Sequence, residues 1–305
     1  MALDMGGSNV RATSYELKGN GVLEVVKEVK HSIPTEYMSG TAEQVFGFLA
    51  DCIVEAHPEP GTKLGFTFSF PSEQTAINRS KLVIWTKGFS ASGCVGVDSV
   101  ELLEKALAAR NCPVKVTATC NDTVGTLISR SYSDPNTAVG IILGTGCNAA
   151  YMENMSRIEK TKVDSRSGKM IINMECGATG DNHPSILPLL PFDVTLDPLT
   201  PNVTHQRLEK MMSGFYLGEL TRMWAVELWG QKKLFVGHPG NCPFFTTFLS
   251  FDSKYCSILL GDASPSLEEV GRILTQFGIP DTSLEDRQCV QRIVHAIVRR
   301  SARLM

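Results

Sequence analysis

Two stretches of the chain alternate strictly between apolar residues and small or polar ones. Residues 64–70 alternate leucine and phenylalanine with glycine, threonine and serine, and residues 114–120 show a second, shorter alternation. A period of two is typical of a strand that buries one face. The second strand is followed directly by Asn121 and Asp122, so the pattern predicts that these two polar residues lie at its carboxyl end.

Helical spacing appears in the remaining parts of the chain. Asp98 precedes apolar residues at positions 100, 103 and 107, which predicts a helix with Asp98 as its N-cap. Apolar residues at 208, 211, 212 and 215 predict the start of one long helix that closes near Gly230, and the pattern beyond Leu267 is mostly helical. Residues 179–201 contain five prolines and no clean period, which predicts an ordered irregular loop.

Two glycine-rich turns each follow an apolar run. Residues 1–5 lead into a turn at 6–9, and residues 138–143 lead into a turn at 144–148 that continues as a strand. A further strand is predicted at 170–175. Strands that alternate with helices indicate an α/β protein. The repeated unit suggests two related halves that face each other, with a ligand bound between them where polar strand ends converge.

Composition and charge narrow the classes of function. The chain has 305 residues, 43% of them hydrophobic, and a net charge of −3. This length favours about two domains, and the charge excludes a broad basic surface for nucleic acid or anionic lipid. The nine scattered cysteines lack a Cys-x-x-Cys spacing and are interpreted as reduced core thiols. No apolar run reaches the roughly 18 residues of a membrane span, and no signal peptide is visible, so a cytoplasmic protein is expected.

The glycine-rich turns and the Asn121-Asp122 pair each allow a structural and a chemical interpretation. Glycine lets backbone N–H groups approach an oxygen closely, so such turns bind phosphate, although most glycine turns serve only to reverse the chain. Two of them after apolar strands favour phosphate binding. Asp122 fits an N-cap of the next helix; the chemical alternative is a general base at a strand end.

Lys87 and three polar residues of the second half are further candidates. Lys87 lies between Trp85 and Phe89, where a charged side chain is a suitable ligand for hydroxyl or phosphate oxygen, although an isolated lysine is usually a solvated surface charge. Gln206 and Glu209 are three residues apart on one helix face. With Glu175 they would form a polyol-binding set, but an acidic group near a helix start also suits the helix dipole.

Together these segments resemble the hexokinase family over essentially the whole chain. The most specific segment is 64–89, which matches the family's sugar-binding signature at every constrained position through Leu64-Gly-Phe-Thr-Phe-Ser-Phe-Pro71, Ile77-Asn78, Leu82 and Trp85-Thr-Lys-x-Phe89. The resemblance continues through Asn121-Asp-Thr-Val-Gly-Thr126, Gly144-Thr-Gly-x-Asn148-Ala, Met174-Glu175-x-Gly-Ala178, Gln206-x-x-Glu209-Lys-Met-x-Ser-Gly-x-Tyr-Leu-Gly-Glu219, Leu267-Glu-Glu-Val-Gly-Arg-Ile-Leu274 and Arg299-Arg-Ser-Ala-Arg-Leu304.

The resemblance implies an α/β, two-lobed, duplicated actin-like (ribonuclease H-like) fold that closes over glucose and Mg-ATP. It places the small lobe at residues 1–122 and the large lobe at 123–305. The implied activity transfers the γ-phosphoryl group of ATP to the 6-hydroxyl of a hexose, the first step of glycolysis. Hexose and Mg-ATP are the implied partners, with no nucleic acid and no membrane span, and the oligomeric state is left open.

The resemblance also assigns roles to single residues. Asp122 is the implied base and Lys87 the second catalytic residue. The implied hexose contacts are Ser69, Thr86, Lys87, Asn121, Asp122, Asn148, Glu175, Gln206 and Glu209. The implied phosphate contacts are Asp4, Gly6, Gly7, Ser8, Asn9 and Arg11 in the first loop and Gly144, Thr145 and Gly146 in the second. Asp4 is also implied to face Mg²⁺ through water.

Some features depart from the family pattern. Ser8, Val10, Cys176, Thr179 and Val203-Thr204 replace the usual residues beside the contact positions. The family's adenosine-binding motif does not follow Met305, and the helical segment before the first phosphate loop is also absent, so a chain truncated at both ends, with an incomplete large lobe, is expected. Two alternatives therefore stand beside a hexokinase: a non-catalytic hexose-binding or sensing module, and an inactive fragment.

Overall fold

The computed structural model describes residues 1–160 and 167–305. Its internal contacts divide it into two compact units. The first comprises Met1–Ile141 and Ala149–Met174, and the second comprises Ile142–Asn148 and Glu175–Met305. The expected lobe boundary at residue 122 lies inside the first unit, and the lobe assignment stays a prediction.

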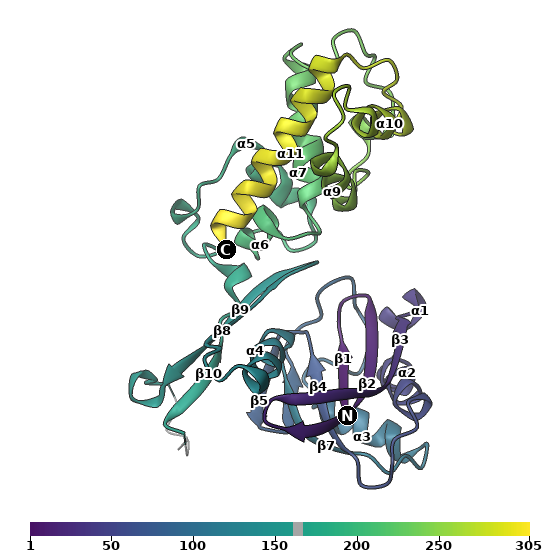
Figure 1. Ribbon diagram of the computed structural model, residues 1–305, viewed down its shortest axis with the longest axis vertical. Helices are drawn as coiled ribbons and strands as arrows, with labels where there is room; N and C mark the ends of the chain where they lie inside the picture. Colours follow the sequence, from purple (N-terminus) through teal and green to yellow (C-terminus); the bar gives the residue numbers. More distant parts are fainter. Residues whose placement is uncertain (161–166) are drawn as a thin grey trace. The chain divides into compact units, whose positions relative to one another are not determined.

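The first unit is built on a five-stranded mixed sheet (Figure 1) with the order β3-β2-β1-β4-β7. The first three strands along the chain form an antiparallel meander, whereas β4 and β7 run parallel to β1. The sheet strands are β1 (Ala2–Met5), β2 (Asn9–Gly19), β3 (Val22–Ser32), β4 (Lys63–Phe68) and β7 (Lys115–Cys120). The other elements are β5 (Ser72–Ala76), β6 (Arg79–Leu82), α1 (Thr35–Met38), α2 (Ala42–Glu55), α3 (Ser99–Ala108), α4 (Asp122–Ser133), η1 (Met155–Arg157) and β10 (Lys169–Asn173).

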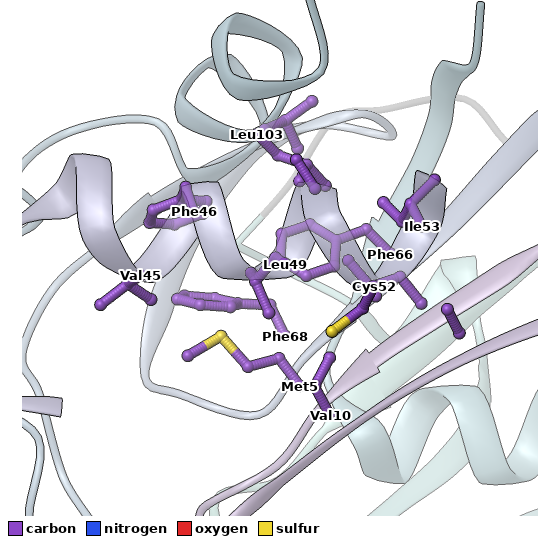
Figure 2. Packing of buried hydrophobic residues seen from close by; sticks show 14 of the residues in the cluster. Met5, Val10, Val45, Phe46, Leu49, Cys52, Ile53, Phe66, Phe68 and Leu103 are labelled. Atoms are coloured by element: carbon purple, nitrogen blue, oxygen red, sulfur yellow. The ribbon is translucent and has the colours of Figure 1, made fainter. Parts of the chain in front are cut away.

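Successive side chains of each strand point to opposite faces of the sheet, and the two faces pack against different helices. Phe66 and Phe68 are buried on the face that carries α2 and α3, and Figure 2 shows them packed with Met5 and Leu49. The intervening Thr67 lies on the opposite face, against Gly125 of α4. The predicted alternation at 64–70 is confirmed by β4, and Asp98 is confirmed as the N-cap of α3. The strand predicted at 114–120 is present as β7, but its alternation is wrong, because a register shift at Thr117 leaves Val116 and Thr119 as its buried residues.

Strands β8 (Val139–Leu143) and β9 (Cys147–Asn154) contribute residues to both units and form a three-stranded sheet in the order β10-β9-β8. The rest of the second unit is helical, with the long C-terminal α11 packed against α6, α7 and α9 (yellow in Figure 1). Its elements are η2 (Cys176–Ala178), η3 (Pro184–Ile186), α5 (Pro191–Leu196), η4 (Asp197–Leu199), α6 (Arg207–Met212), α7 (Leu217–Gly230), α8 (Pro243–Thr246), α9 (Ser253–Gly261), α10 (Glu268–Gln276) and α11 (Leu284–Leu304).

Three details of the sequence prediction are wrong. The expected long helix from residue 208 is two helices, because the Gly214 and Phe215 N–H groups donate to the carbonyls of Gly144 and Thr145 instead of continuing α6. The expected irregular loop at 179–201 contains α5 and short 3₁₀ turns. The expected strand at 170–175 ends at Asn173. Within the described residues, no helix is long and apolar enough to cross a membrane.

Candidate active site

A row of polar side chains crosses the sheet on the face that carries α4. The strand register places Arg11 opposite Asp4, Asp4 opposite Thr67, and Thr67 opposite Cys120. Because side chains directly opposite each other share a face, Asp4 points to the side where α4 begins, immediately after Cys120. Arg11 is also 3.8 Å from Glu28 in an ion pair.

The start of α4 resolves the two interpretations of Asp122. Asn121, with extended backbone, is the N-cap, and its Oδ1 accepts the Thr123 N–H at 2.9 Å. Asp122 is instead the first residue of the helix, and one of its carboxylate oxygens accepts a hydrogen bond from the Thr123 hydroxyl at 3.2 Å. Asn121 therefore does the capping, so capping does not explain the carboxylate of Asp122.

The carboxylate of Asp4 is affected by its surroundings. Burial raises the pKa of Asp4, and the negative charge of Asp122 raises it further, whereas Arg11 and Lys87 lower it. In the described part of the chain, the Asp4 carboxylate has no hydrogen bond and no ion pair within 4.0 Å. A half-buried, unneutralised carboxylate beside a second one is an arrangement that a divalent cation would stabilise.

Lys87 lies at the edge of an aromatic cluster. Its Nζ donates to the Ser69 carbonyl at 2.7 Å and lies 5.4 Å from the centre of the Phe70 ring. Trp85 and Phe89 stack at 5.1 Å, and both contact Phe70. The Ser69 hydroxyl is buried and has no hydrogen-bond partner among the described residues. The Lys87 ammonium group thus contacts the backbone of a serine whose buried hydroxyl has no partner among the described residues.

The first glycine-rich turn is tightly closed and lies against Lys87. The Gly6 N–H donates to the Asn9 carbonyl at 2.9 Å, and the Ser8 carbonyl accepts the Ile33 N–H at 3.0 Å. A Cβ on Gly7 would lie 2.8 Å from the Lys87 Cδ, so the lysine stem fills the space that a larger residue would need. Thr86 is half-buried, and its carbonyl closes the turn to Phe89.

In the second unit, Glu209 of α6 lies against the second glycine-rich turn. Its Oε2 accepts the Cys147 N–H at 2.9 Å, and a Cβ on Gly146 would lie 2.5 Å from the same oxygen. Only a glycine at 146 therefore permits this approach. The Gly144 N–H donates to the Gly146 carbonyl at 2.9 Å, which closes the turn around Thr145.

The other predicted hexose contacts of this unit lie beside Glu209. Asn148 donates from Nδ2 to Glu175 at 3.4 Å and accepts the Cys176 N–H at 3.3 Å. The side-chain carbonyl of Gln206 lies next to Gly177, where a Cβ would be 2.5 Å away. The carboxylates, amide groups and glycine-rich turn of this unit are thus brought together, as Ser69, Lys87, Asp4 and Asp122 are in the first unit.

Sequence reasoning missed two features of the second unit. Asp181 accepts the N–H groups of Gln206 and Arg207 at 2.8 and 2.9 Å. A cavity of about 400 Å³ also adjoins the second glycine-rich turn. It is lined by Thr145, Gly214, Phe215, Leu249, Phe251, Asp252 and Ser253. Asp181 lies in a stretch without periodicity, and the cavity joins segments about 100 residues apart, so no local pattern signals either.

The α/β fold and the two glycine-rich turns agree with the sugar-kinase class of α/β proteins that the sequence predicted. Family models described as Hexokinase match residues 1–132 and 138–305. The chain therefore belongs to the hexokinase family.

Relatives and solved structures agree with this assignment. The chain is 40% identical to rat Hexokinase-2 over its whole length, which is 33% of that protein, and 38% identical to Hexokinase-1 of Schizosaccharomyces pombe, of which it spans 64%. A Schistosoma mansoni hexokinase solved with glucose superposes with a TM-score of 0.88 at 36% identity, covering 99% of this chain and 69% of that one. The predicted fold class is thereby confirmed.

Proposed function

We propose that the chain forms the sugar-binding and phosphate-binding part of an ATP-dependent hexokinase that phosphorylates the 6-hydroxyl of a hexose such as glucose. The observation that carries this proposal is the position of Asp122. It begins α4 while Asn121 caps the helix, and its charge acts on Asp4. The glucose in the Schistosoma mansoni relative supports the choice of sugar.

In this proposal, Asp122 accepts the proton of the attacking hydroxyl. The hydroxyl oxygen then forms a bond to the γ-phosphorus while the bond from that phosphorus to the β-phosphate bridging oxygen breaks, and ADP leaves. Phosphoryl transfer needs positioning and charge stabilisation more than covalent catalysis. Lys87, with its Nζ 2.7 Å from the Ser69 carbonyl, supplies a fixed positive charge next to the first glycine-rich turn.

The second unit supplies acceptors and donors for the hydroxyls of the sugar. Glu175 and Glu209 offer carboxylate oxygens, while Asn148 and Gln206 offer both a carbonyl and an amide. These side chains come from β9, from the residue before η2 and from the start of α6. A site built to hydrogen-bond hydroxyls discriminates against analogues that lack them.

Mg²⁺ and ATP complete the proposal. Asp4 fits a magnesium ion held through water, because its carboxylate is half-buried and lacks a cationic partner within ion-pair distance in the described residues. When bound, the ion would neutralise phosphate charge. The two glycine-rich turns offer backbone N–H groups to phosphates. The cavity beside Thr145, about 400 Å³, is large enough for part of a nucleotide.

The test measures glucose-dependent ADP release and glucose binding by this chain. We expect Asp122→Asn to lower the turnover rate by about 10²–10⁴ while the dissociation constant for glucose changes only a few-fold, since a general base contributes that much to rate. Asp134→Asn, at the other end of α4, is the matched control and should behave as wild type. Equal turnover in Asp122→Asn contradicts the proposal. Glucose binding without ADP release by wild type would favour the non-catalytic hexose-binding module.

A further inference from the structure

The turn that precedes α6 contains two residues in the left-handed region. Thr204 has φ 67° and Gln206 has φ 57°. This conformation is uncommon for residues other than glycine, and more so for a β-branched threonine. Such residues persist only where the surrounding contacts determine their conformation, and they cluster at functional sites.

Two aspartates hold this turn through its backbone N–H groups. Asp197 accepts the Thr204 N–H with both carboxylate oxygens at 3.1 Å. Asp181 accepts the Gln206 N–H at 2.8 Å with one oxygen and the Arg207 N–H at 2.9 Å with the other. Hydrogen bonds to an ionised acceptor are about twice as strong as neutral ones, so these carboxylates can fix a conformation that the turn would otherwise avoid.

Asp181 connects two segments of the proposed hexose site. Its own N–H donates to the Ala178 carbonyl at 3.1 Å, which ties it to the 3₁₀ turn that follows Glu175. Its carboxylate holds the residue 25 positions later whose side chain lies against Gly177. His205 Nδ1 lies 3.8 Å from Asp181 Oδ2. Asp181 therefore sets the position of Gln206 relative to the Glu175 segment.

We propose that Asp181 is a positioning residue for the hexose site, which rests on the hexose-binding function proposed above. Asp181 contacts backbone and not sugar. Through the backbone N–H of Gln206, it holds this residue where its side chain lies against Gly177. Removing the Asp181 carboxylate therefore weakens hexose binding only when the Gln206 side chain is present. If Asp181 had a purely structural role, the effect of removing it would be the same with and without that side chain.

The experiment is a double-mutant cycle with a sugar-independent readout. Glucose dissociation constants are measured by calorimetry for wild type, Asp181→Asn, Gln206→Ala and the double variant. Residue-resolved amide hydrogen exchange is measured in the sugar-free chain at Gln206 and Arg207. Asp262→Asn is the matched control, because Asp262 accepts the Ser264 and Val270 N–H groups at the start of α10 in the same way.

We expect Asp181→Asn to accelerate exchange at both amides and to weaken glucose binding roughly tenfold, as the loss of a hydrogen bond to a charged group would. In the Gln206→Ala background the same change should weaken binding less than about twofold. Asp262→Asn should leave affinity and these two amides unchanged.

Unchanged exchange in Asp181→Asn, an equal loss of affinity in both backgrounds, or an equal loss in Asp262→Asn overturns the positioning role. A wild-type chain that binds no hexose overturns the proposed function instead. The exchange measurement, which needs no sugar, distinguishes that failure from a failure of Asp181.

Discussion

Replacing Lys210 by methionine removes the more deeply buried of the two cations of α6. The Lys210 side chain is 5% exposed, and its Nζ donates to Asp197 at 2.6 Å and to the Asn202 carbonyl at 2.8 Å. Methionine keeps the length of the apolar stem but not the charge. Among the described residues, the Asp197 carboxylate would then keep the Thr204 N–H and the guanidinium of Arg207 at 3.6 Å as partners.

The expected loss of stability is about 3 kcal/mol, the lower end of the range for breaking a buried ion pair, because Arg207 still compensates part of the charge. The pH dependence should change with it. Burial works to raise the pKa of Asp197, but the Lys210 hydrogen bond, the Thr204 N–H and the charges of Lys210 and Arg207 outweigh it and lower that pKa. A lowered pKa gives stability that is present above the unfolded-state value of about 3.9 and is lost as the pH falls through the folded-state value.

Urea unfolding followed by tryptophan fluorescence checks this prediction. A Trp85→Phe background leaves Trp224 and Trp229 as reporters of the second unit. Lys210→Met should lower the free energy of unfolding at pH 7 and flatten its decline below about pH 4. A loss below about 1 kcal/mol, or an unchanged pH profile, would refute the reasoning that this pair stabilises the turn and α6.

Two further predictions concern the first unit. Asp4→Asn should raise the melting temperature of the ligand-free chain at pH 7 by a few degrees and weaken Mg-ATP binding. Burial and Asp122 raise the pKa of Asp4, so the ionised carboxylate destabilises the folded chain at a pH above the unfolded-state pKa of about 3.9. Equal melting temperatures of wild type and variant at pH 7 would contradict this. Gly140→Ala should lower the free energy of unfolding in urea by about 1–3 kcal/mol, because its Cβ would lie 2.9 Å from the Leu127 Cβ. Gly65→Ala is the control and should show no such steric loss, because its Cβ would meet nothing within 4 Å. Equal effects of the two substitutions would contradict this.

Strand β4 was predictable because its burial has a period of two along the sequence. In β7 this period is interrupted by the register shift at Thr117. The pattern at 64–70 specified which residues of β4 face the core, and α2 and α3 cover that face in the structure. The helix break after Met212 was not predictable from periodicity. Apolar spacing continues through it, and the break depends on N–H groups of Gly214 and Phe215 that donate to the second glycine-rich turn, about 70 residues earlier.

The candidate site could be predicted only in part, because some of its features depend on contacts that are distant in the sequence. Asn and Asp are both favoured N-cap residues. The sequence therefore did not decide whether Asn121 or Asp122 caps α4, and which of the two side chains is not used for capping. The register of the helix decided it in favour of Asn121. Asp181 could not be found at all, because it acts on a backbone segment 25 residues away and no local spacing signals such a contact.

Backbone conformation gives an independent reason to regard the predicted hexose contacts as functional. Twelve of the described non-glycine residues lie in the left-handed region, and three of them, Lys87, Glu175 and Gln206, belong to the nine predicted contacts. A left-handed residue costs roughly 1–2 kcal/mol, so packing alone would not favour three in one small set. The contact of Lys87 with Ser69 and the hold of Asp181 on Gln206 offset that cost. We therefore expect this backbone conformation to present the three polar groups to a ligand.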